Sequence, residues 1–485
     1  MPPTPDATHD NQIPLVVDLD GTLIKTDLLW ESFVRLLKKN PLWLFAALFW
    51  WAHGRAFLKQ QLAARVTIDP AILPYDEKFL AWLREQKSRG RKIILATASD
   101  LKLAKPVADH TGLFDEVLAS DGKTNLRSAN KLKALTEKFG ARGFDYAGNS
   151  SADLAVWRGA REAIVVNAGA SLVKKASYCT KVEKVFEPEA SLSRAFLRSL
   201  RPHQWVKNLI VFVPIIAAHK LGEPALVLRE IFAFIIFCLC ASGVYLVNDL
   251  MDLDADRRHP TKKNRPFASG NLPLQFGLIL GPSLLLAGLL AAVQLSWVFA
   301  GVTAAYLILT TTYSLWVKQI ALLDVFFLAG LYTIRLVAGH AAADIIYSAW
   351  LLMFSMFIFL SLALVKRYVE LADAKEPSSD KSAVAGRGYV AGDLEIVASL
   401  GTGSGYLAAL VLALYVNSQQ VVILYAHPNL LLLICPLLLY WISRVWLLAH
   451  RGQLHDDPVF FAVKDATSYI IGALALAVLW LAAGH

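Results

Sequence analysis

Hydrophobic runs along this chain change in length near residue 200. Before that position they are short, as at residues 13–19, 92–96 and 144–147, and polar turns separate them. Short apolar runs between turns are typical of buried strands in a parallel sheet. After residue 200 the uncharged stretches become long enough to cross a bilayer, which takes about 20 helical residues. The pattern predicts an α/β Rossmann-like domain followed by an all-α polytopic membrane domain.

Uncharged stretches in the second part predict nine transmembrane helices. Two stretches, residues 266–317 and 396–443, are each long enough for two helices. A further helix would hold Asp324 and Arg335. The weakest is expected around residues 205–219, because few uncharged residues lie between the flanking lysines. Single helices are expected at residues 231–248, 345–365 and 466–485.

Basic residues fall mostly in the loops expected on one side of the membrane, and the opposite loops hold only Lys220 and Arg229. Because Lys and Arg are enriched in cytoplasmic loops, we expect a multi-pass protein of a bacterial-type inner (plasma) membrane. Its N-terminal domain would be cytoplasmic and its C-terminus would lie outside. Residues 1–12 are polar and are expected to form a flexible N-terminus rather than a signal peptide.

Charge is concentrated in the first 200 residues, which carry 51 charged side chains against 36 in the remaining 285. This division excludes a single globular fold and a disordered chain. The net charge of +9 is expected to hold the soluble domain near anionic headgroups and does not indicate nucleic acid. The four cysteines are too few for a secreted disulfide scaffold.

One apolar segment of the soluble part, residues 40–53, is too short to span a bilayer. Its three tryptophans, Trp43, Trp50 and Trp51, suit the headgroup region of a membrane. The same composition also suits a buried helix of the soluble domain. Contact with the membrane surface is the favoured interpretation, and the buried helix stays open.

Polar side chains follow three of the short hydrophobic runs. Asp18 and Asp20 follow the first run, Thr97 follows the second, and the third leads into residues 148–153. Because ligands of open α/β sheets bind beyond the carboxyl ends of the strands, these side chains are expected to form one site. Lys131 opens a helix between the second and third runs.

This ordered set resembles the haloacid dehalogenase (HAD) superfamily of phosphatases over about residues 12–180. The resemblance implies that Asp18 is the nucleophile and that Asp20 is the general acid and base. It further implies that Thr97 binds the phosphate and that Lys131 neutralises charge. Ser99 and Lys123 are rivals for those two roles. The implied Mg²⁺ ligands are Asp18, Asp20, Asn149 and Asp153.

The sequence departs from that family at one position, since Asn149 stands where many members have Asp. The change removes a negative charge from the metal site but leaves an oxygen ligand, so we expect activity to persist. Residues 27–74 between the first two strands are expected to form a small helical cap.

An Asp-rich segment ends the second predicted transmembrane helix. Helical spacing places Asn248, Asp249, Asp252 and Asp256 on one face. Uncompensated carboxylates beside lipid are costly, so a function is the default interpretation. Mg²⁺ prefers such oxygens and commonly binds together with substrate phosphates.

With Arg265 in the following KNRP sequence, this segment resembles the UbiA superfamily of intramembrane prenyltransferases over about residues 195–485. Their second motif is also Asp-rich, whereas here it is basic and contains Lys366, Arg367 and Glu370, with Arg387 beyond. Together with the RPHQWVKN sequence that contains Lys207, the pattern resembles the decaprenyl-phosphate phosphoribosyltransferase branch. That resemblance implies catalysis by Asp249 and Asp252 with Mg²⁺. It also implies substrate binding by Lys207, Asn248, Asp256, Arg265, Lys366, Arg367, Glu370 and Arg387.

The resulting hypothesis is a bifunctional enzyme. The membrane domain would transfer 5-phosphoribosyl from phosphoribosyl pyrophosphate (PRPP) to polyprenyl phosphate, and the HAD domain would remove the 5-phosphate. The alternatives are an aromatic prenyltransferase that uses a prenyl diphosphate, with a HAD domain of other or lost activity, and a cation-coupled transporter. A homo-oligomer is compatible with the sequence. The expected boundaries are residues 13–180 for the HAD domain, 181–200 for a linker and 201–485 for the membrane domain.

Two further charged groups are left with two interpretations each. Asp324 and Arg335 would form buried pairs with other helices or contact substrate. Asp456, Asp457, Lys464 and Asp465 would be loop charges before the last helix or would line the site.

Overall fold

The computed structural model describes residues 13–121, 124–373, 388–454 and 457–484. Contacts divide the chain into two units. The first comprises residues 1–200 and 245–281, and the second comprises residues 201–244 and 282–485. The Asp-rich segment therefore belongs to the same unit as the α/β fold, and each unit is described in turn.

A six-stranded parallel sheet forms the centre of the first unit, with the strand order β3-β2-β1-β4-β5-β6. β1 lies between β2 and β4, and its Val16 is in register with Ile94 on one side and Tyr146 on the other. All three residues are buried. The strands are β1 (Leu15–Val17), β2 (Ile93–Asp100), β3 (Glu116–Ser120), β4 (Asp145–Gly148), β5 (Glu162–Val166) and β6 (Lys181–Phe186).

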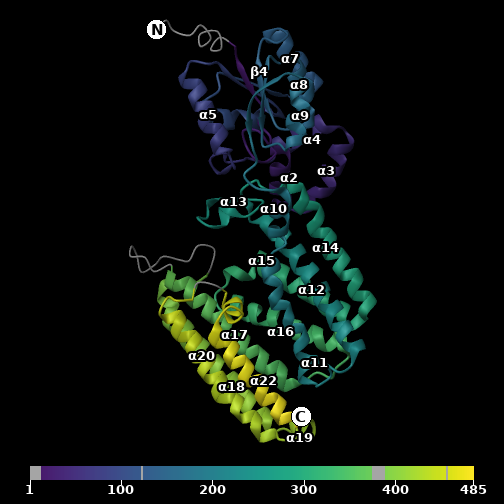
Figure 1. The fold of residues 1–485 in the computed structure, drawn as a ribbon, viewed down its shortest axis with the longest axis vertical. Helices are drawn as coiled ribbons and strands as arrows, with labels where there is room; N and C mark the ends of the chain where they lie inside the picture. The colour runs from purple at the N-terminus through teal and green to yellow at the C-terminus, as the bar shows by residue number, and fades with distance from the viewer. Residues whose placement is uncertain (1–12, 122–123, 374–387, 455–456, 485) are drawn as a thin grey trace. The chain divides into compact units, whose positions relative to one another are not determined.

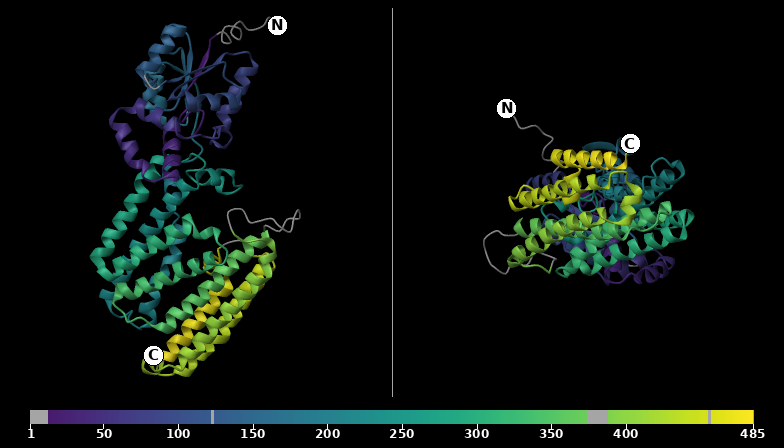
Figure 2. Two further views of the ribbon diagram at one scale, coloured as in Figure 1. Left: turned by 180° about the vertical axis from the view of Figure 1, so that it is seen from behind. Right: turned by 90° about the horizontal axis from the view of Figure 1, so that it is seen from below.

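Helices cover both faces of this sheet (Figures 1 and 2), as a parallel sheet requires. On one face the core contains Phe79 of α5 (Glu77–Ser88) and Leu103 of α6 (Leu101–Thr111). On the other it contains Leu135 and Trp157. These belong to α7 (Ala129–Phe139) and α8 (Leu154–Gly159), and α9 (Ala170–Ser177) packs beside them. The α/β expectation is confirmed.

The segment expected as a linker begins with a strand. β6 covers residues 181–186 and pairs in parallel with β5, so the sheet extends past residue 180. Helix α10 (Leu192–Ser199) follows it. No residue of β6 is buried, because the strand lies at the edge of the sheet, and this explains its polar sequence.

Three α-helices lie within residues 27–74, as expected for a cap: α2 (Leu28–Lys39), α3 (Trp43–Ala52) and α4 (Arg55–Ala63). The Asp27 carboxylate starts α2 by accepting a hydrogen bond from the Leu29 N–H. In α3, Trp50 is buried whereas Phe45, Phe49 and Trp51 are exposed. One side of α3 thus packs in the cap and the other is apolar and uncovered within the described residues.

The Asp-rich segment forms the end of one helix and the start of another. α12 (Pro224–Met251) ends one residue before Asp252, which caps the short helix α13 (Leu253–Arg258). The Asp252 and Asp256 N–H groups still bond carbonyls four residues earlier, so the two helices are nearly continuous. Asp249 and Asp256 of the expected face both pair with Arg265, and Asp252 takes the N-cap position between the two helices.

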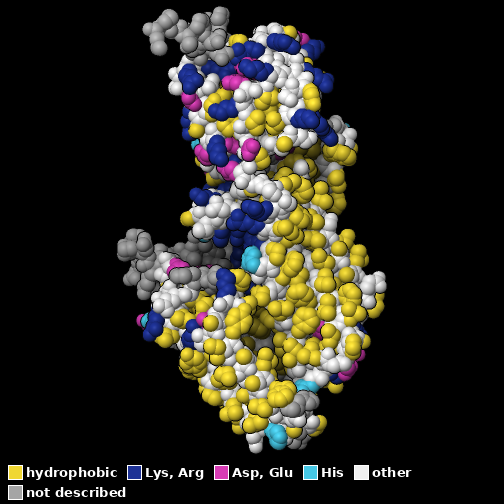
Figure 3. Space-filling model, viewed as in Figure 1, with side chains coloured by type: hydrophobic (Ala, Val, Ile, Leu, Met, Phe, Trp, Pro, Cys, Tyr) yellow, Lys and Arg dark blue, Asp and Glu magenta, His cyan; other side chains and the backbone are white. Residues whose placement is uncertain are grey.

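The second unit is helical, and hydrophobic side chains cover much of its visible surface (Figure 3). Eight helices among the described residues are long and apolar enough to cross a membrane, one fewer than expected. Besides α12 they are α14 (Leu274–Leu295), α15 (Trp297–Leu315), α16 (Leu323–Ala343), α17 (Ala349–Asp373), α18 (Leu394–Val416), a helix over Pro428–His450 whose α-helical part is α20 (Ile434–His450), and α22 (Ala466–Ala483).

The ninth expected helix, around residues 205–219, is divided. It begins as the 3₁₀ helix η3 (Pro202–Phe212) and ends as the short α11 (Val213–Ala217). Because a 3₁₀ helix rises about 2.0 Å per residue, the combined segment reaches roughly 30 Å, the thickness of a bilayer core. A ninth crossing stays a prediction.

Candidate functional sites

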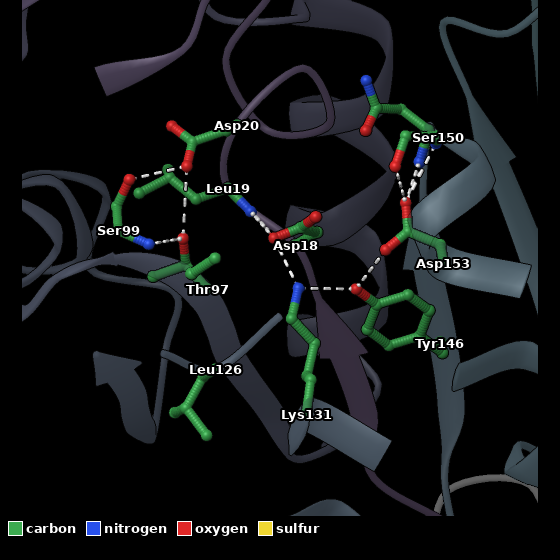
Figure 4. A network of polar contacts seen from close by, with 12 residues as sticks. Asp18, Leu19, Asp20, Thr97, Ser99, Leu126, Lys131, Tyr146, Ser150 and Asp153 are labelled. Atoms are coloured by element: carbon green, nitrogen blue, oxygen red, sulfur yellow. Dashed lines mark hydrogen bonds and ion pairs between the residues drawn. The ribbon is translucent and has the colours of Figure 1, made fainter. Parts of the chain in front are cut away.

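The Asp18 carboxylate lies at the end of β1 and is held by two donors. Its Oδ1 accepts from the Leu19 N–H at 2.9 Å and from Lys131 Nζ at 2.8 Å. The same ammonium donates to the Tyr146 hydroxyl at 2.8 Å, and that hydroxyl donates to Asp153 Oδ1 at 2.9 Å. Figure 4 shows this continuous chain from Asp18 to Asp153. The structure therefore joins predicted residues of β1, α7 and the β4 loop.

Figure 4 shows Asp20 on the side of Asp18 that lies away from Asp153. Asp20 Oδ2 accepts from Ser99 Oγ at 2.6 Å and lies 3.4 Å from Thr97 Oγ1, while Asp20 Oδ1 accepts from the Leu28 N–H at 2.9 Å. Thr97 Oγ1 also accepts from the Ser99 N–H at 3.0 Å. Both rivals on β2 therefore contact Asp20, with Ser99 the closer, and Asp20 is aligned by the first turn of α2.

The loop after β4 presents Asp153 and Asn149. Asp153 Oδ2 accepts from Ser150 Oγ at 2.9 Å and from the backbone N–H groups of Ser150 and Asn149 at 2.9 and 3.1 Å. The Asn149 amide lies against Gly21, where a Cβ atom would be only 2.0 Å from Nδ2. Gly21 also has a φ of 75°, so both space and backbone conformation require glycine there.

Burial raises the pKa of Asp18 to about 7, and the nearby Asp153 and Asp20 charges add to this while Lys131 opposes it. Burial likewise raises the pKa of Asp20 to about 6, assisted by Asp27. The two ammonium groups of Lys131 and Lys59 thus face the four carboxylates of Asp18, Asp20, Asp27 and Asp153. This excess of oxygen donors fits a hard divalent cation such as Mg²⁺, which Asp18, Asp20, Asn149 and Asp153 would hold.

A cavity of about 970 Å³ opens above these residues within the first unit. Asp18, Asp20, Lys131 and Asp153 lie at its wall. Residues 270–275, which follow the Asp-rich segment, contribute another part of the wall. The cavity is large enough for a substrate much bigger than inorganic phosphate.

The Asp-rich segment carries an ion-pair network of its own. Arg265 Nη1 lies 2.6 Å from Asp256 Oδ2 and 3.2 Å from Asp249 Oδ1, and both aspartates are buried. Arg265 thereby holds the two carboxylates together. Asn248 lies one residue before Asp249 in α12, and Asp252 stands at the junction of α12 and α13. The predicted residues thus gather around one helix junction.

Asp457 connects two of the predicted cations in the second unit. Its Oδ2 lies 2.8 Å from Lys207 Nζ and 3.4 Å from Lys366 Nζ. Burial opposes its charge, but the two ammonium groups outweigh it and lower the pKa of Asp457 to about 2. Asp457 therefore pairs with two of the predicted cations, and both interpretations of it stay open.

Arg367 does not match its expected role in substrate binding. It lies within α17 rather than in a loop, and it is 1% exposed. Its Nε lies 2.8 Å from Asp324 Oδ2, and Glu370 pairs with Nη1. Tyr389 donates to Asp324 Oδ1 at 2.7 Å. A fully enclosed guanidinium with two carboxylate partners suits a positioning role for Arg367, whereas Glu370 is 32% exposed and its expected role stays a prediction.

Arg335 is likewise buried with polar partners. Its Nε donates to Asn208 Oδ1 at 2.9 Å, and its Nη2 donates to the Tyr306 hydroxyl at 3.3 Å. Asp324 and Arg335 therefore pair with different groups, in line with the structural interpretation. Lys123, Arg387 and Asp456 lie outside the described residues.

Sequence reasoning missed Tyr146, which links Lys131 to Asp153. The only signal was its position inside a buried strand, where a tyrosine hydroxyl needs a partner. It also missed the cations Arg55, Lys59 and Arg127 of the cavity wall, since they lie in the cap and in a loop without a motif.

Comparison with known proteins matches separate parts of the chain to two families. The UbiA prenyltransferase family matches residues 208–471, and the family of haloacid dehalogenase-like hydrolases matches residues 15–158. The chain belongs to the UbiA prenyltransferase family. It is a fusion of a HAD-like domain with a UbiA transferase domain, and its apolar helices make it a multi-pass membrane protein.

Relatives extend over different parts of this UbiA-family protein. An uncharacterized protein y4nM of Sinorhizobium fredii is 38% identical over 96% of this chain and 90% of its own length. Nodulation protein NoeC of Azorhizobium caulinodans is 37% identical over 59% of this chain and 92% of its own. Decaprenyl-phosphate phosphoribosyltransferase of Mycolicibacterium smegmatis is 38% identical over 38% of this chain and 59% of its own length. The solved structure of a UbiA homologue from Archaeoglobus fulgidus bound to GPP and Mg²⁺ has a TM-score of 0.45 at 16% identity. The match covers 59% of this chain and 99% of the homologue.

Proposed function

We propose that this protein makes a lipid-linked ribose in two steps. The UbiA domain transfers 5-phosphoribosyl from PRPP to a polyprenyl phosphate, with release of pyrophosphate. The HAD domain then hydrolyses the 5-phosphate of the product. The observation that carries the proposal is the combination of an Asp-rich helix junction with a phosphatase-type centre in one unit of one chain.

The transfer step needs both anionic and cationic groups. Asp249 and Asp252 are proposed to hold Mg²⁺, which would neutralise the diphosphate that leaves PRPP. Arg265, placed between Asp249 and Asp256, would bind phosphate oxygens bidentately. Lys207 and Lys366 are proposed to bind further phosphate oxygens. Support for PRPP as the donor comes from these cations and from the similarity to decaprenyl-phosphate phosphoribosyltransferases.

The geometry around Asp18 supports the proposed hydrolytic step. A carboxylate oxygen of Asp18 attacks the phosphorus, and the bond from phosphorus to the ribose O5′ breaks. Asp20 donates its proton to that oxygen, a role suited to a pKa of about 6. Asp20 then takes a proton from a water molecule that attacks the phosphoaspartate and releases phosphate. Mg²⁺ would lower the negative charge between Asp18 and the phosphate.

Lys131 and Thr97 are proposed to position charge and hydrogen bonds at the phosphatase centre. Lys131 is fixed by Tyr146 at 2.8 Å and would place its charge against the transferred phosphoryl group. Thr97 and Ser99 orient Asp20 and would donate to phosphate oxygens. A cytoplasmic N-terminal domain and an outer C-terminus are part of the proposal. The predicted inner loops are basic, which is typical of the cytoplasmic side. PRPP is highly charged and does not cross a bilayer, so its binding site should also face the cytoplasm.

The experiment that tests the proposal uses purified full-length protein in lipid nanodiscs. It is incubated with PRPP, Mg²⁺ and polyprenyl phosphate, and the lipid product is weighed by mass spectrometry. A lipid phosphoryl-ribose and free phosphate are expected. If PRPP yields no lipid-linked sugar while a prenyl diphosphate alkylates an aromatic acid, the chain is an aromatic prenyltransferase instead. Ion flux in proteoliposomes without transfer would indicate a transporter.

A further inference from the structure

Three cations in the cavity above Asp18 have no part in the phosphatase chemistry. Arg55, Lys59 and Arg127 line the same cavity as Asp18 and Asp20. The hydrolysis described above uses only Lys131 as a side-chain cation. A second group of positive charge at one cavity implies a second negative group on the molecule that fills it.

Two of these cations come from successive turns of one helix. Arg55 and Lys59 are four residues apart in α4, so they lie on the same face. Lys59 Nζ donates to the Ala98 carbonyl at 2.6 Å, which fixes that face against the end of β2. Burial lowers the pKa of Lys59, and the charges of Asp20 and Asp27 oppose the shift. The helix therefore holds its cations at the rim of the catalytic centre.

Arg127 lines the same cavity but comes from a different element. It lies four residues before Lys131, in the segment that leads into α7. Its positive charge also contributes to the lowered pKa of Lys59, so the charges from α4 and from this segment face a common space. Two separate elements thus direct positive charge into the cavity.

The arginines are the members of the group that remain available for a ligand. Lys131 is bound to Asp18 and Tyr146, and Lys25 of the same cavity is paired with Glu189 at 2.7 Å. Among the described residues, the guanidinium groups of Arg55 and Arg127 have no hydrogen-bond or ion-pair partner. A guanidinium binds a phosphate with two parallel hydrogen bonds.

Apolar side chains stand beside these cations. Trp30, Trp51 and Leu58 line the cavity, and Trp51 is 61% exposed. Trp51 belongs to α3, whose exposed Leu48 and Phe45 continue the apolar surface away from the cavity. A ligand that places a phosphate at the arginines can therefore extend a hydrocarbon chain along α3.

We infer that the cavity binds a substrate with two separate phosphates, a monoester at Asp18 and a diester at Arg55 and Arg127, followed by an apolar chain on α3. The inference rests on the proposed phosphatase function and adds how the substrate is selected. A soluble sugar phosphate with one phosphate would leave the arginines empty. The product of the proposed transfer step carries both phosphates and a lipid.

Two synthetic substrates that differ in one group test the inference on the full-length protein with Mg²⁺. The first is methyl ribofuranoside 5-phosphate, and the second carries a methyl phosphodiester at C1 in addition. We expect wild type to prefer the diester in kcat/KM. Because a charged hydrogen bond contributes about 1.5–3 kcal/mol, Arg55→Ala and Arg127→Ala should each reduce that preference by about ten- to hundredfold, mainly through KM.

The matched control is Arg89→Ala, which removes an exposed arginine that pairs with Glu85 and does not line the cavity. It should leave the preference unchanged. A farnesyl phosphodiester in place of the methyl compound adds the apolar chain, and Trp51→Ala should weaken only the gain that this chain brings.

A binding measurement tests the second phosphate site separately from the phosphatase activity. In an Asp18→Asn background, which cannot turn over, calorimetry should show tighter binding of the diester than of the single-phosphate compound, and Arg127→Ala should remove the difference. Equal binding, or a preference that both arginine variants retain, overturns the inference while hydrolysis by wild type still supports the phosphatase. A wild type that binds the diester but hydrolyses neither compound overturns the phosphatase function and supports the anion site.

Discussion

Glu31 of the cap helix α2 and Arg257 of α13 form a buried ion pair, although 226 residues separate them. Arg257 Nη2 lies 2.6 Å from Glu31 Oε1, and Nη1 lies 3.1 Å from Oε2. Arg35 also pairs with Glu31 and reaches Asp254 at 2.5 Å. Burial opposes the charge of Glu31, but the two guanidinium groups outweigh it and lower its pKa to about 2. The cap is thereby tied to the helix that follows Asp252.

Replacing Glu31 should therefore damage both the unit and the transfer step. Glu31→Gln leaves Arg257 and Arg35 without their shared carboxylate, and removing one partner of a buried pair costs about 3–5 kcal/mol. We expect a Tm lowered by about 10 °C and slower pyrophosphate release, because α13 loses its support. Differential scanning fluorimetry and a pyrophosphate assay on the same preparation measure the two effects.

The control for this change is the neighbouring pair of Arg258 and Asp69, whose side chains are 64% and 48% exposed. Exposed pairs contribute less than about 1 kcal/mol, so Asp69→Asn should hardly change Tm. If Glu31→Gln also leaves Tm and pyrophosphate release at the wild-type level, the pair does not hold α13 in place.

The Asp-rich segment should be needed for transfer but not for hydrolysis. Asp249→Asn removes a charge from the proposed Mg²⁺ ligands, so pyrophosphate release should be abolished while hydrolysis of a soluble sugar phosphate continues. Asp69→Asn is the control here too, because the exposed Asp69 pairs with Arg258 and is not a proposed Mg²⁺ ligand. Full transfer by Asp249→Asn, or by wild type in excess chelator, would contradict the assignment.

Removing the phosphatase nucleophile should stop hydrolysis and leave transfer intact. Asp18→Asn cannot form the phosphoaspartate, so the 5-phosphorylated lipid should accumulate at an unchanged rate of transfer. Mass spectrometry distinguishes it from the dephosphorylated product by the mass of one phosphate group. Dephosphorylated lipid from this variant, or its absence from wild type, would show that the HAD domain has another substrate.

The catalytic centre of the HAD-like domain could be predicted because its residues follow from local rules. Parallel strands present their carboxyl ends at one edge of the sheet, so runs ending in Asp18, Thr97 and Asn149 had to meet. Lys131 could be placed by its helix. Tyr146 could not, since its hydroxyl gains a role only through the packing of α7 against β4.

The remaining differences also come from tertiary packing. Periodicity identifies Lys366 and Arg367 as neighbours in one basic motif, but it does not reveal that Arg367 turns inward to Asp324 while Lys366 turns to Asp457. It identifies the Asp-rich face, but not the docking of α13 on α2. The strand β6 reads as a polar linker because an edge strand buries little.

Metal binding at the phosphatase centre should weaken in acid. A ligand must lose its proton before it binds a cation, and the pKa of Asp18 is raised to about 7. Below that pH the carboxyl group holds its proton, so the apparent affinity for Mg²⁺ should fall about tenfold for each pH unit. Titrating phosphatase activity with Mg²⁺ at pH 6, 7 and 8 measures it, and an affinity independent of pH would contradict the raised pKa.

The two adjacent cations of α17 should respond differently to substitution. Lys366 is 35% exposed and shares Asp457 with Lys207, so Lys366→Ala should raise the KM for a phosphate-bearing substrate with little change in Tm. Arg367→Ala instead leaves Asp324 enclosed without its cation, a change that costs about 3–5 kcal/mol. It should lower Tm and reduce kcat together with the amount of folded protein.

A double variant distinguishes a structural role of the Arg367–Asp324 pair from substrate binding by Arg367. Arg367→Met with Asp324→Asn removes both buried charges, and replacing a buried pair with uncharged groups of similar size is often close to neutral for stability. We expect Tm and transfer to recover toward wild type, because neither group is needed by the substrate. A double variant that regains Tm but still lacks transfer would return Arg367 to the substrate site, where the basic motif first placed it.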